Sequence, residues 1–264
     1  SADSHITEPP NCYLDHIEPA WREKAPRIVH KEGLGDIYVI EGMKTPVPMG
    51  LVAAAGVAPQ DIRTGGARFA DLHRSGWDPS VRLADQDRDG VGAEIIYPTV
   101  GMVICNHKDL DYKQACFEAY NRWLADIWKQ GKGRLRWVVA PPLRDLEETR
   151  KEIRFGKENG ACGIFIRGIE SEMRLVNPYL FRVYEMAQEF DLAICLHSGN
   201  NSFHLHDLYA TEGGFARAKL PAIAAFHNLI MDEIPKKFPK VRWGFIEVSA
   251  QWLPYAYNDL SLRF

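Results

Sequence analysis

Residues 158–200 read ENGACGIFIRGIESEMRLVNPYLFRVYEMAQEFDLAICLHSGN. Two short apolar runs, 163–167 and 193–197, flank a segment with helical spacing at 178–191. Gly160 stands where a helix C-cap glycine would precede the first apolar run. A strand, a helix and a second strand joined by short connections predict a βαβ unit with parallel strands.

The same alternation extends outward along most of the chain. Further strands are expected at 2–6, 93–97, 135–140 and 241–248, and further helices at 111–130, 143–159 and 220–238. Residues 28–82 interrupt this pattern with many Gly and Pro residues, and long excursions of this kind are usually functional or mobile. We therefore expect one α/β domain over residues 1–264, with a long insertion of a hairpin and loops at 28–82.

The composition is typical of a folded, soluble protein, with 46% hydrophobic and 25% charged residues. The 32 basic and 35 acidic residues give a net charge of −3, which provides no electrostatic reason for a nucleic-acid partner. No apolar run approaches the roughly 18 residues that a membrane span needs. Five scattered cysteines without a C-x-x-C pair favour a reducing compartment. We expect a cytoplasmic protein that acts on a small-molecule substrate and binds neither nucleic acid nor membrane.

Polar residues stand at the ends of two expected strands. Asp3 and His5 are two apart at the end of the first strand, so they project to the same side and form half of a metal site. His197 follows four apolar residues at the end of the fifth strand and is expected to point into the crevice where α/β enzymes bind ligands. Glu8 lies just past the first strand, within reach of the same space. Taken alone, Asp3 and His5 are better explained as an ordinary polar strand end, but two strands that each end in a potential ligand favour a site.

The expected sixth strand carries Glu247 in an otherwise apolar run. A buried carboxylate must be paired, protonated or bound to a cation. Two interpretations stay open: Glu247 belongs to the site, or it forms a salt bridge with Arg167 at the end of the fourth strand.

The remaining polar candidates are weaker. His107 follows the second strand and is a candidate for substrate contact, while His204 lies in a loop where it would line the pocket or be solvated. His227 lies on a helical pattern, which favours a structural role. Neighbouring strand residues face opposite ways, so Ser198 is not expected to form a dyad with His197. The motifs of nucleotide enzymes and serine hydrolases, G-x-G-x-x-G, the Walker loop and G-x-S-x-G, are absent.

Five motifs together suggest a family. They are D-S-H-x-x-E-P (3–9), R-L-A-D-Q-D-R-D-G-V-G-A-E-I-I-Y-P-T (82–99), A-Y-N-R-W-L-A (119–125), L-H-S-G (196–199) and F-P-K-V-R-W-G-F-I-E-V-S-A-Q-W-L-P (238–254). The combination resembles the branch of the amidohydrolase superfamily that includes aminocarboxymuconate-semialdehyde decarboxylase and related hydrolases. The resemblance implies a (β/α)8 TIM-barrel-like fold of metal-dependent hydrolases. Six strands are expected here, whereas the family closes its barrel with two more and an aspartate, so we expect the chain to be part of a longer one.

The resemblance also implies a divalent metal, zinc, manganese or iron, held as one or two ions at the C-terminal ends of the strands. Asp3, His5 and His197 match the family's ligand positions. Glu247 stands where many relatives place a catalytic or metal-binding histidine, so it is a candidate for either role. Barrels of this branch are often oligomers, and a homo-oligomer is expected.

The first functional interpretation is hydrolysis of an amide, ester or thioester of a small, apolar or aromatic substrate. A cation with three protein ligands lowers the pKa of its water to about 7, and Glu247, Glu8 or His227 would move the proton. The alternative is non-oxidative decarboxylation of an aromatic or unsaturated carboxylate, with Arg167 binding the carboxylate. A third interpretation is an inactive ligand-binding barrel that holds no metal.

Overall fold

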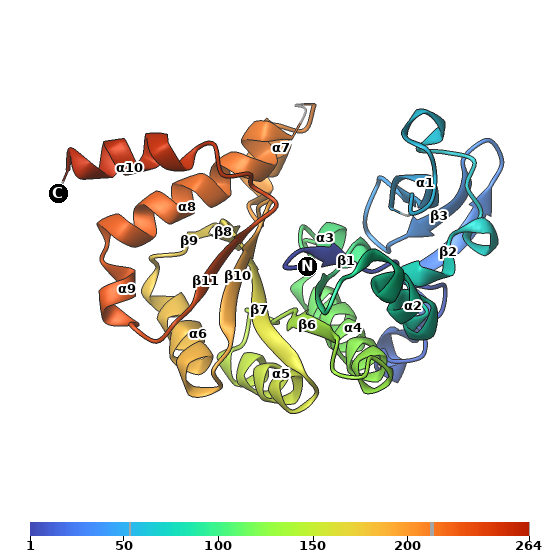
Figure 1. Cartoon of the computed structure of the whole chain (residues 1–264), viewed down its shortest axis with the longest axis horizontal. Coiled ribbons are helices and arrows are strands. Elements are labelled where there is room, and N and C mark those ends of the chain that lie inside the picture. The colour runs from blue at the N-terminus through green and yellow to red at the C-terminus, as the bar shows by residue number, and fades with distance from the viewer. Residues whose placement is uncertain (53, 212–213, 264) are drawn as a thin grey trace.

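The computed structural model describes residues 1–52, 54–211 and 214–263, and its centre is a curled sheet of six strands (Figure 1). The strand order is β1 (Ser4–His5), β5 (Glu94–Tyr97), β6 (Leu135–Val139), β7 (Ala161–Arg167), β10 (Ala193–His197) and β11 (Trp243–Ile246). Every neighbouring pair is parallel, as the sequence predicts. The sheet is a half-barrel of the (β/α)8 type, and within the described residues β1 and β11 form its edges.

Helices connect the successive strands. They are α2 (Pro79–Asp89), α3 (Val100–Ile104), α4 (Leu110–Gln130), α5 (Leu146–Glu158), α6 (Pro178–Glu189), α7 (Phe203–Leu208), α8 (Leu220–Met231) and α9 (Ile234–Lys237), with α10 (Leu253–Ser261) after β11. Two clusters of buried apolar side chains fill the space between the sheet and these helices. Within the described residues, no helix combines the length and the apolar character that crossing a membrane requires.

The structure corrects the helical predictions in several places. The helix expected at 220–238 is divided into α8 and α9 because Glu233 adopts a left-handed φ of 54° and Pro235 begins a new turn. The helix α2 was not expected, although Asp78 caps its first turn and Gly90 ends it in the left-handed conformation. It begins inside the segment that the sequence analysis assigned to the insertion.

The insertion contains the expected hairpin, formed by β2 (Arg27–Lys31) and β3 (Gly35–Val39). It continues through β4 (Val47–Pro48) and α1 (Met49–Val52) and then through short turns to α2. Figure 1 places it beside β1, on the opposite side of the molecule from β11 and α10. Because it joins β1 to α2, its last turns lie close to the candidate ligands on β1.

Candidate metal centre

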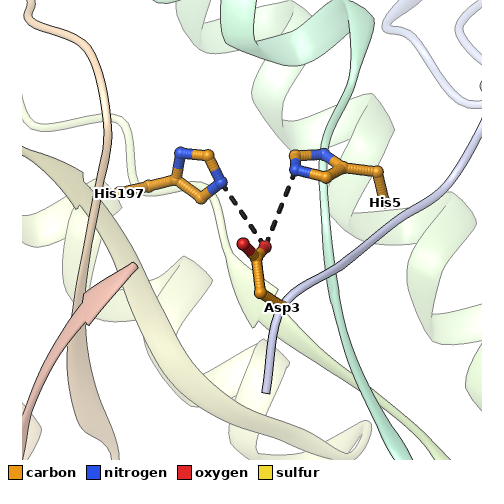
Figure 2. A group of neighbouring side chains, drawn as sticks. All are labelled: Asp3, His5 and His197. Carbon is orange, nitrogen blue, oxygen red and sulfur yellow. Dashed lines mark ion pairs between the residues drawn. The ribbon is translucent and has the colours of Figure 1, made fainter. Parts of the chain in front are cut away.

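Three potential metal ligands meet between β1 and β10 (Figure 2). Oδ1 of Asp3 lies 3.7 Å from Nε2 of His5 and 3.7 Å from Nε2 of His197. All three ligand atoms lie within 4.8 Å of one another. Ligands in a tetrahedral zinc site with bonds near 2.1 Å are about 3.4 Å apart, so small shifts would bring these atoms to ligand spacing. Within the described residues, this is the one group of three His, Cys, Asp or Glu side chains with such spacing.

The two imidazoles present their Nε2 atoms to Asp3 because their Nδ1 atoms face hydrogen-bond acceptors. Nδ1 of His5 lies 2.9 Å from the carbonyl oxygen of Pro98, which only accepts, so Nδ1 carries the proton. Nδ1 of His197 lies 3.3 Å from the carbonyl oxygen of Ser198. Metal-binding histidines usually hold their second nitrogen in this way, which fixes the ring and its tautomer.

Burial and charge favour the protonation states that coordinate a metal. The His197 side chain is fully buried, and burial lowers its pKa, so the ring is neutral near pH 7. Asp3 is ionised near pH 7, because an aspartate carboxyl group ordinarily has a pKa of about 3.9. Nε2 of His197 has no hydrogen-bond partner, although buried polar atoms normally have one. Two imidazoles and one carboxylate therefore fit a divalent transition metal.

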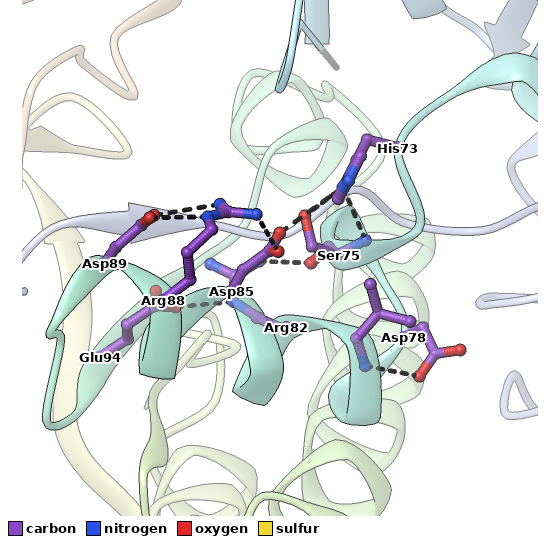
Figure 3. A network of polar contacts seen from close by, with 9 residues as sticks. His73, Ser75, Asp78, Arg82, Asp85, Arg88, Asp89 and Glu94 are labelled. Atoms are coloured by element: carbon purple, nitrogen blue, oxygen red, sulfur yellow. Dashed lines mark hydrogen bonds and ion pairs between the residues drawn. The ribbon is translucent and has the colours of Figure 1, made fainter.

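A cleft of about 610 Å³ opens beside His5. Its walls come from the insertion and from α2, and they include His73, Ser75, Asp85 and Arg88 (Figure 3). Arg88 pairs with Asp85, and Nδ1 of His73 lies 2.7 Å from the Ser75 hydroxyl, so most polar groups of this wall are satisfied by one another. The cleft gives a small molecule room next to one of the candidate ligands.

A sequence model of the amidohydrolase family matches residues 55–263. The chain belongs to the amidohydrolase family. The resemblance seen in the five motifs is thereby confirmed at the level of the family. A search of curated protein sequences gave no significant match.

Solved structures share the fold of this amidohydrolase, two of them over nearly the whole given chain. An amidohydrolase from Mycobacterium avium subsp. paratuberculosis K-10 has a TM-score of 0.70 and 20% identity over 100% of this chain and 75% of its own. The IDCase of Metarhizium anisopliae has a TM-score of 0.67 and 15% identity, over 99% and 68%. The 5-carboxyvanillate decarboxylase of Novosphingobium aromaticivorans DSM 12444, complexed with manganese and 4-hydroxy-3-methoxy-5-nitrobenzoic acid, has a TM-score of 0.56 and 21% identity, over 69% and 55%.

Glu247 is not the buried carboxylate that the sequence predicts in this amidohydrolase. Its side chain is 51% exposed, because β11 ends at Ile246 and Glu247 leaves the sheet with a left-handed φ of 60°. It accepts a hydrogen bond of 2.5 Å from the hydroxyl of Ser198 and forms no ion pair with Arg167. The structure therefore brings Glu247 next to His197, and the salt-bridge interpretation is wrong.

Ser198 does not face away from His197 as strand alternation implies, although the hydrogen bonding is consistent with the prediction that the two residues form no dyad. The strand β10 ends at His197, so the alternation of strand side chains no longer applies to the next residue. The Ser198 hydroxyl lies 3.4 Å from Nδ1 of His197, but it donates its proton to Glu247. Ser198 thus links the exposed carboxylate to the buried imidazole and is not poised as a nucleophile.

Glu8 lies outside the ligand group. It is completely buried, and its two carboxylate oxygens accept hydrogen bonds from the backbone N–H groups of Thr99, Val100 and Gly101. Burial raises its pKa, and the three hydrogen bonds act in the opposite direction. The structure places Glu8 as the cap of α3 and gives it no free oxygen for a metal or a substrate.

The other histidine candidates are also apart from the three ligands. Nε2 of His227 lies 2.8 Å from the carboxylate of Asp259, which links α8 to α10. Nε2 of His107 lies 2.6 Å from the carbonyl oxygen of Glu41, which fastens the insertion to the segment before α4. His204 is exposed on α7.

Arg167 lies next to the candidate centre. It is the register partner of His197 on the neighbouring strand, and only 4% of its surface is exposed. Its Nη2 donates to the carbonyl oxygen of Met102 at 3.3 Å, and its Nε has no hydrogen-bond partner. Among the described residues, no carboxylate lies within 4 Å of the guanidinium. A buried cation without a paired carboxylate is suited to bind an anionic ligand group.

Sequence reasoning missed the groups that hold these side chains. Pro98 acts on His5 through its backbone carbonyl oxygen, which any residue would offer, so no residue type reveals it. Gly199 lies against the guanidinium of Arg167, where a Cβ would be 2.5 Å from Nη1. The L-H-S-G motif contains this glycine just past a strand end. A glycine at such a position indicates that another group packs closely against the backbone.

Proposed function

We propose that this amidohydrolase is a metal-dependent, non-oxidative decarboxylase of a small aromatic or unsaturated carboxylate. The observation that carries the proposal is Arg167, a buried guanidinium without a paired carboxylate among the described residues, in register with the candidate ligand His197. A site that joins metal ligands to a buried cation suits a substrate that bears a carboxylate. The manganese-containing 5-carboxyvanillate decarboxylase of the same fold supports this choice over amide or ester hydrolysis.

Asp3, His5 and His197 would hold the divalent metal, with manganese, zinc and iron all compatible with the ligand set. When bound, a divalent metal supplies Lewis-acid polarisation of a substrate oxygen. The aromatic rings of Tyr97 and Phe165 lie 5.1 and 5.9 Å from the ring of His197, so the buried surroundings of this candidate ligand are largely aromatic.

The chain's own residues then perform two tasks. The guanidinium of Arg167 binds the substrate carboxylate and fixes its orientation relative to the ring. The reaction breaks the bond between the ring and the carboxylate, releases CO2, and leaves the electron pair on a ring carbon that takes up one proton. Of the three proton-transfer candidates in the sequence, Glu247 is the one in contact with the ligand group, so we assign the proton transfer to it.

Hydrolysis is the second candidate function. The exposed carboxylate of Glu247, 3.6 Å from Nδ1 of His197, is also placed to act as a general base toward a water molecule. The two functions differ in their products, because decarboxylation releases CO2 and hydrolysis consumes water.

The test is metal analysis followed by product analysis. We expect the wild type to bind a divalent metal and His197→Ala to lose it, because one of three ligands is removed. The manganese-loaded and zinc-loaded proteins are incubated with 5-carboxyvanillate, hydroxybenzoates and 4-nitrophenyl esters. Release of CO2 by the wild type alone supports decarboxylation. Ester cleavage without CO2 favours hydrolysis, and a wild type without metal or turnover overturns both functions.

A further inference from the structure

His5 stands on a short strand with one neighbour. The strand β1 has two residues and lies at the sheet edge, where the N–H of Ile6 donates to the carbonyl oxygen of Tyr97 at 3.3 Å. The His5–Ile6 peptide is trans, so the carbonyl oxygen of His5 points away from β5. Within the described residues, no strand lies on that outer side to satisfy this carbonyl or to hold the ligand in place.

The side chain of Arg82 takes the place of such a neighbour. Its Nη2 donates to the carbonyl oxygen of His5 at 2.9 Å, and its Nη1 donates to the carbonyl oxygen of Ser75 at 3.2 Å. Its Nε donates to Glu94 at 2.6 Å, and both charged side chains are largely buried (Figure 3). One guanidinium therefore connects β1, the end of the insertion and β5.

A second hydrogen bond strengthens the same edge. The N–H of Thr7 donates to the carbonyl oxygen of Gly76 at 2.8 Å, one residue after the Ser75 carbonyl that Arg82 binds. The last turn of the insertion thus runs along the outer side of the chain around β1. Through Arg82, the position of His5 depends on this turn as well as on β5.

We propose that Arg82 is a positioning residue that sets the place of His5 in the metal centre; this inference rests on the proposed function. A ligand must be held within about 0.5 Å of its working position, and two-residue β1 alone offers few contacts that do so. Arginine is suited to the task because its planar group makes three hydrogen bonds in fixed directions, whereas lysine offers a single ammonium group. Loss of a residue that orients a ligand typically lowers metal affinity about 10–100-fold.

The test compares Arg82→Gln with Arg122→Gln in the whole chain. Arg122 also pairs with a buried carboxylate, Glu152 on α5, but it contacts none of the three ligands, so its loss controls for stability. Affinity for Zn²⁺ is measured by competition with a chelator, and the ligand field by the visible spectrum of the Co²⁺ form. Hydrogen exchange of the Ile6 and Thr7 amides is measured without metal.

We expect Arg82→Gln to bind Zn²⁺ at least about 10-fold more weakly, with an altered Co²⁺ spectrum and faster exchange at Ile6 and Thr7. Arg122→Gln should leave all three readouts unchanged, and Arg82→Lys should restore little of the affinity. Wild-type Zn²⁺ affinity in Arg82→Gln would overturn the proposal. A wild type that binds no metal would instead overturn the proposed function. In that case, hydrogen exchange at Ile6 and Thr7 that is the same in Arg82→Gln as in the wild type would reject the positioning role.

Discussion

Replacing Gly199 with alanine probes how the chain holds Arg167 at the candidate site. Gly199 has a φ of 107°, where alanine is strained by about 1–3 kcal/mol. The new Cβ would lie 2.5 Å from Nη1 and 2.9 Å from Cζ of Arg167, so the guanidinium must move. Its hydrogen bond to Met102 is long, at 3.3 Å, and its loss costs about 1.5 kcal/mol, the low end for a charged donor. The free energy of unfolding should therefore fall by about 2.5–4.5 kcal/mol.

The matched control is Gly133→Ala. Gly133 has a φ of 77°, but a Cβ there meets no heavy atom within 4 Å, so this variant reports the backbone strain alone. Urea unfolding of both variants, without metal, gives the two free energies. We expect the Gly199 variant to lose at least about 1.5 kcal/mol more than the control, and its KM for a carboxylate substrate to rise. Equal losses in the two variants, with an unchanged KM, would refute the claim that Gly199 makes room for Arg167.

Three further outcomes follow from single side chains. Arg167→Gln should raise the KM for a carboxylate substrate about 30-fold, or about 2 kcal/mol, at unchanged metal content; an unchanged KM would exclude carboxylate binding by Arg167. Glu8→Gln should lower the free energy of unfolding by about 2–4 kcal/mol, because the new NH2 group cannot accept hydrogen bonds from the backbone N–H groups at the start of α3. The exposed Glu32→Gln is its control, and equal stabilities would contradict the capping role. Asp78→Ala should cost about 1 kcal/mol at pH 7, because Asp78 caps α2. Chiefly the Ser80 hydroxyl lowers the pKa of Asp78, so its contribution is complete above the unfolded pKa near 3.9 and is lost as pH falls through the lower folded value. A cost that stays constant down to pH 3 would show that folding does not lower the pKa of Asp78.

The central strands β6, β7 and β10 could be predicted from the sequence because they are buried along most of their length and read as largely apolar runs. The run before His197 matches β10 residue for residue. The end of β11 could not be predicted in this way, since the apolar run continues to Val248 while the strand ends at Ile246. Only the positive φ of Glu247 reveals that the chain has turned, and a glutamate gives no local signal of that conformation.

The two predicted carboxylates, Asp3 and Glu8, differ in whether neighbouring residues in the sequence determine their position. Asp3 lies two residues from His5, and the alternation of an extended segment predicts both on one side, where the structure places them although β1 begins only at Ser4. Glu8 looks equally well placed along the chain, but its partners are backbone N–H groups more than 90 residues later. Those donors belong to the first turn of α3, a short helix that the sequence analysis did not expect. Glu8 caps a helix because of hydrogen bonds to residues distant in sequence. The residues next to Glu8 in the sequence give no sign of these hydrogen bonds.

The candidate ligands can be predicted from the sequence more easily than the groups that hold them in place. Parallel strands bring their carboxyl ends to one edge, so polar residues at two strand ends predict a shared site without knowledge of the register. The groups that position these ligands act through backbone carbonyls, as at Pro98, or reach a carbonyl from another element, as Arg82 does. A carbonyl is common to every residue, so such contacts leave no pattern of residue types. In this chain the candidate metal ligands could therefore be predicted from strand ends, while the precision of their placement depends on contacts that only the folded chain reveals.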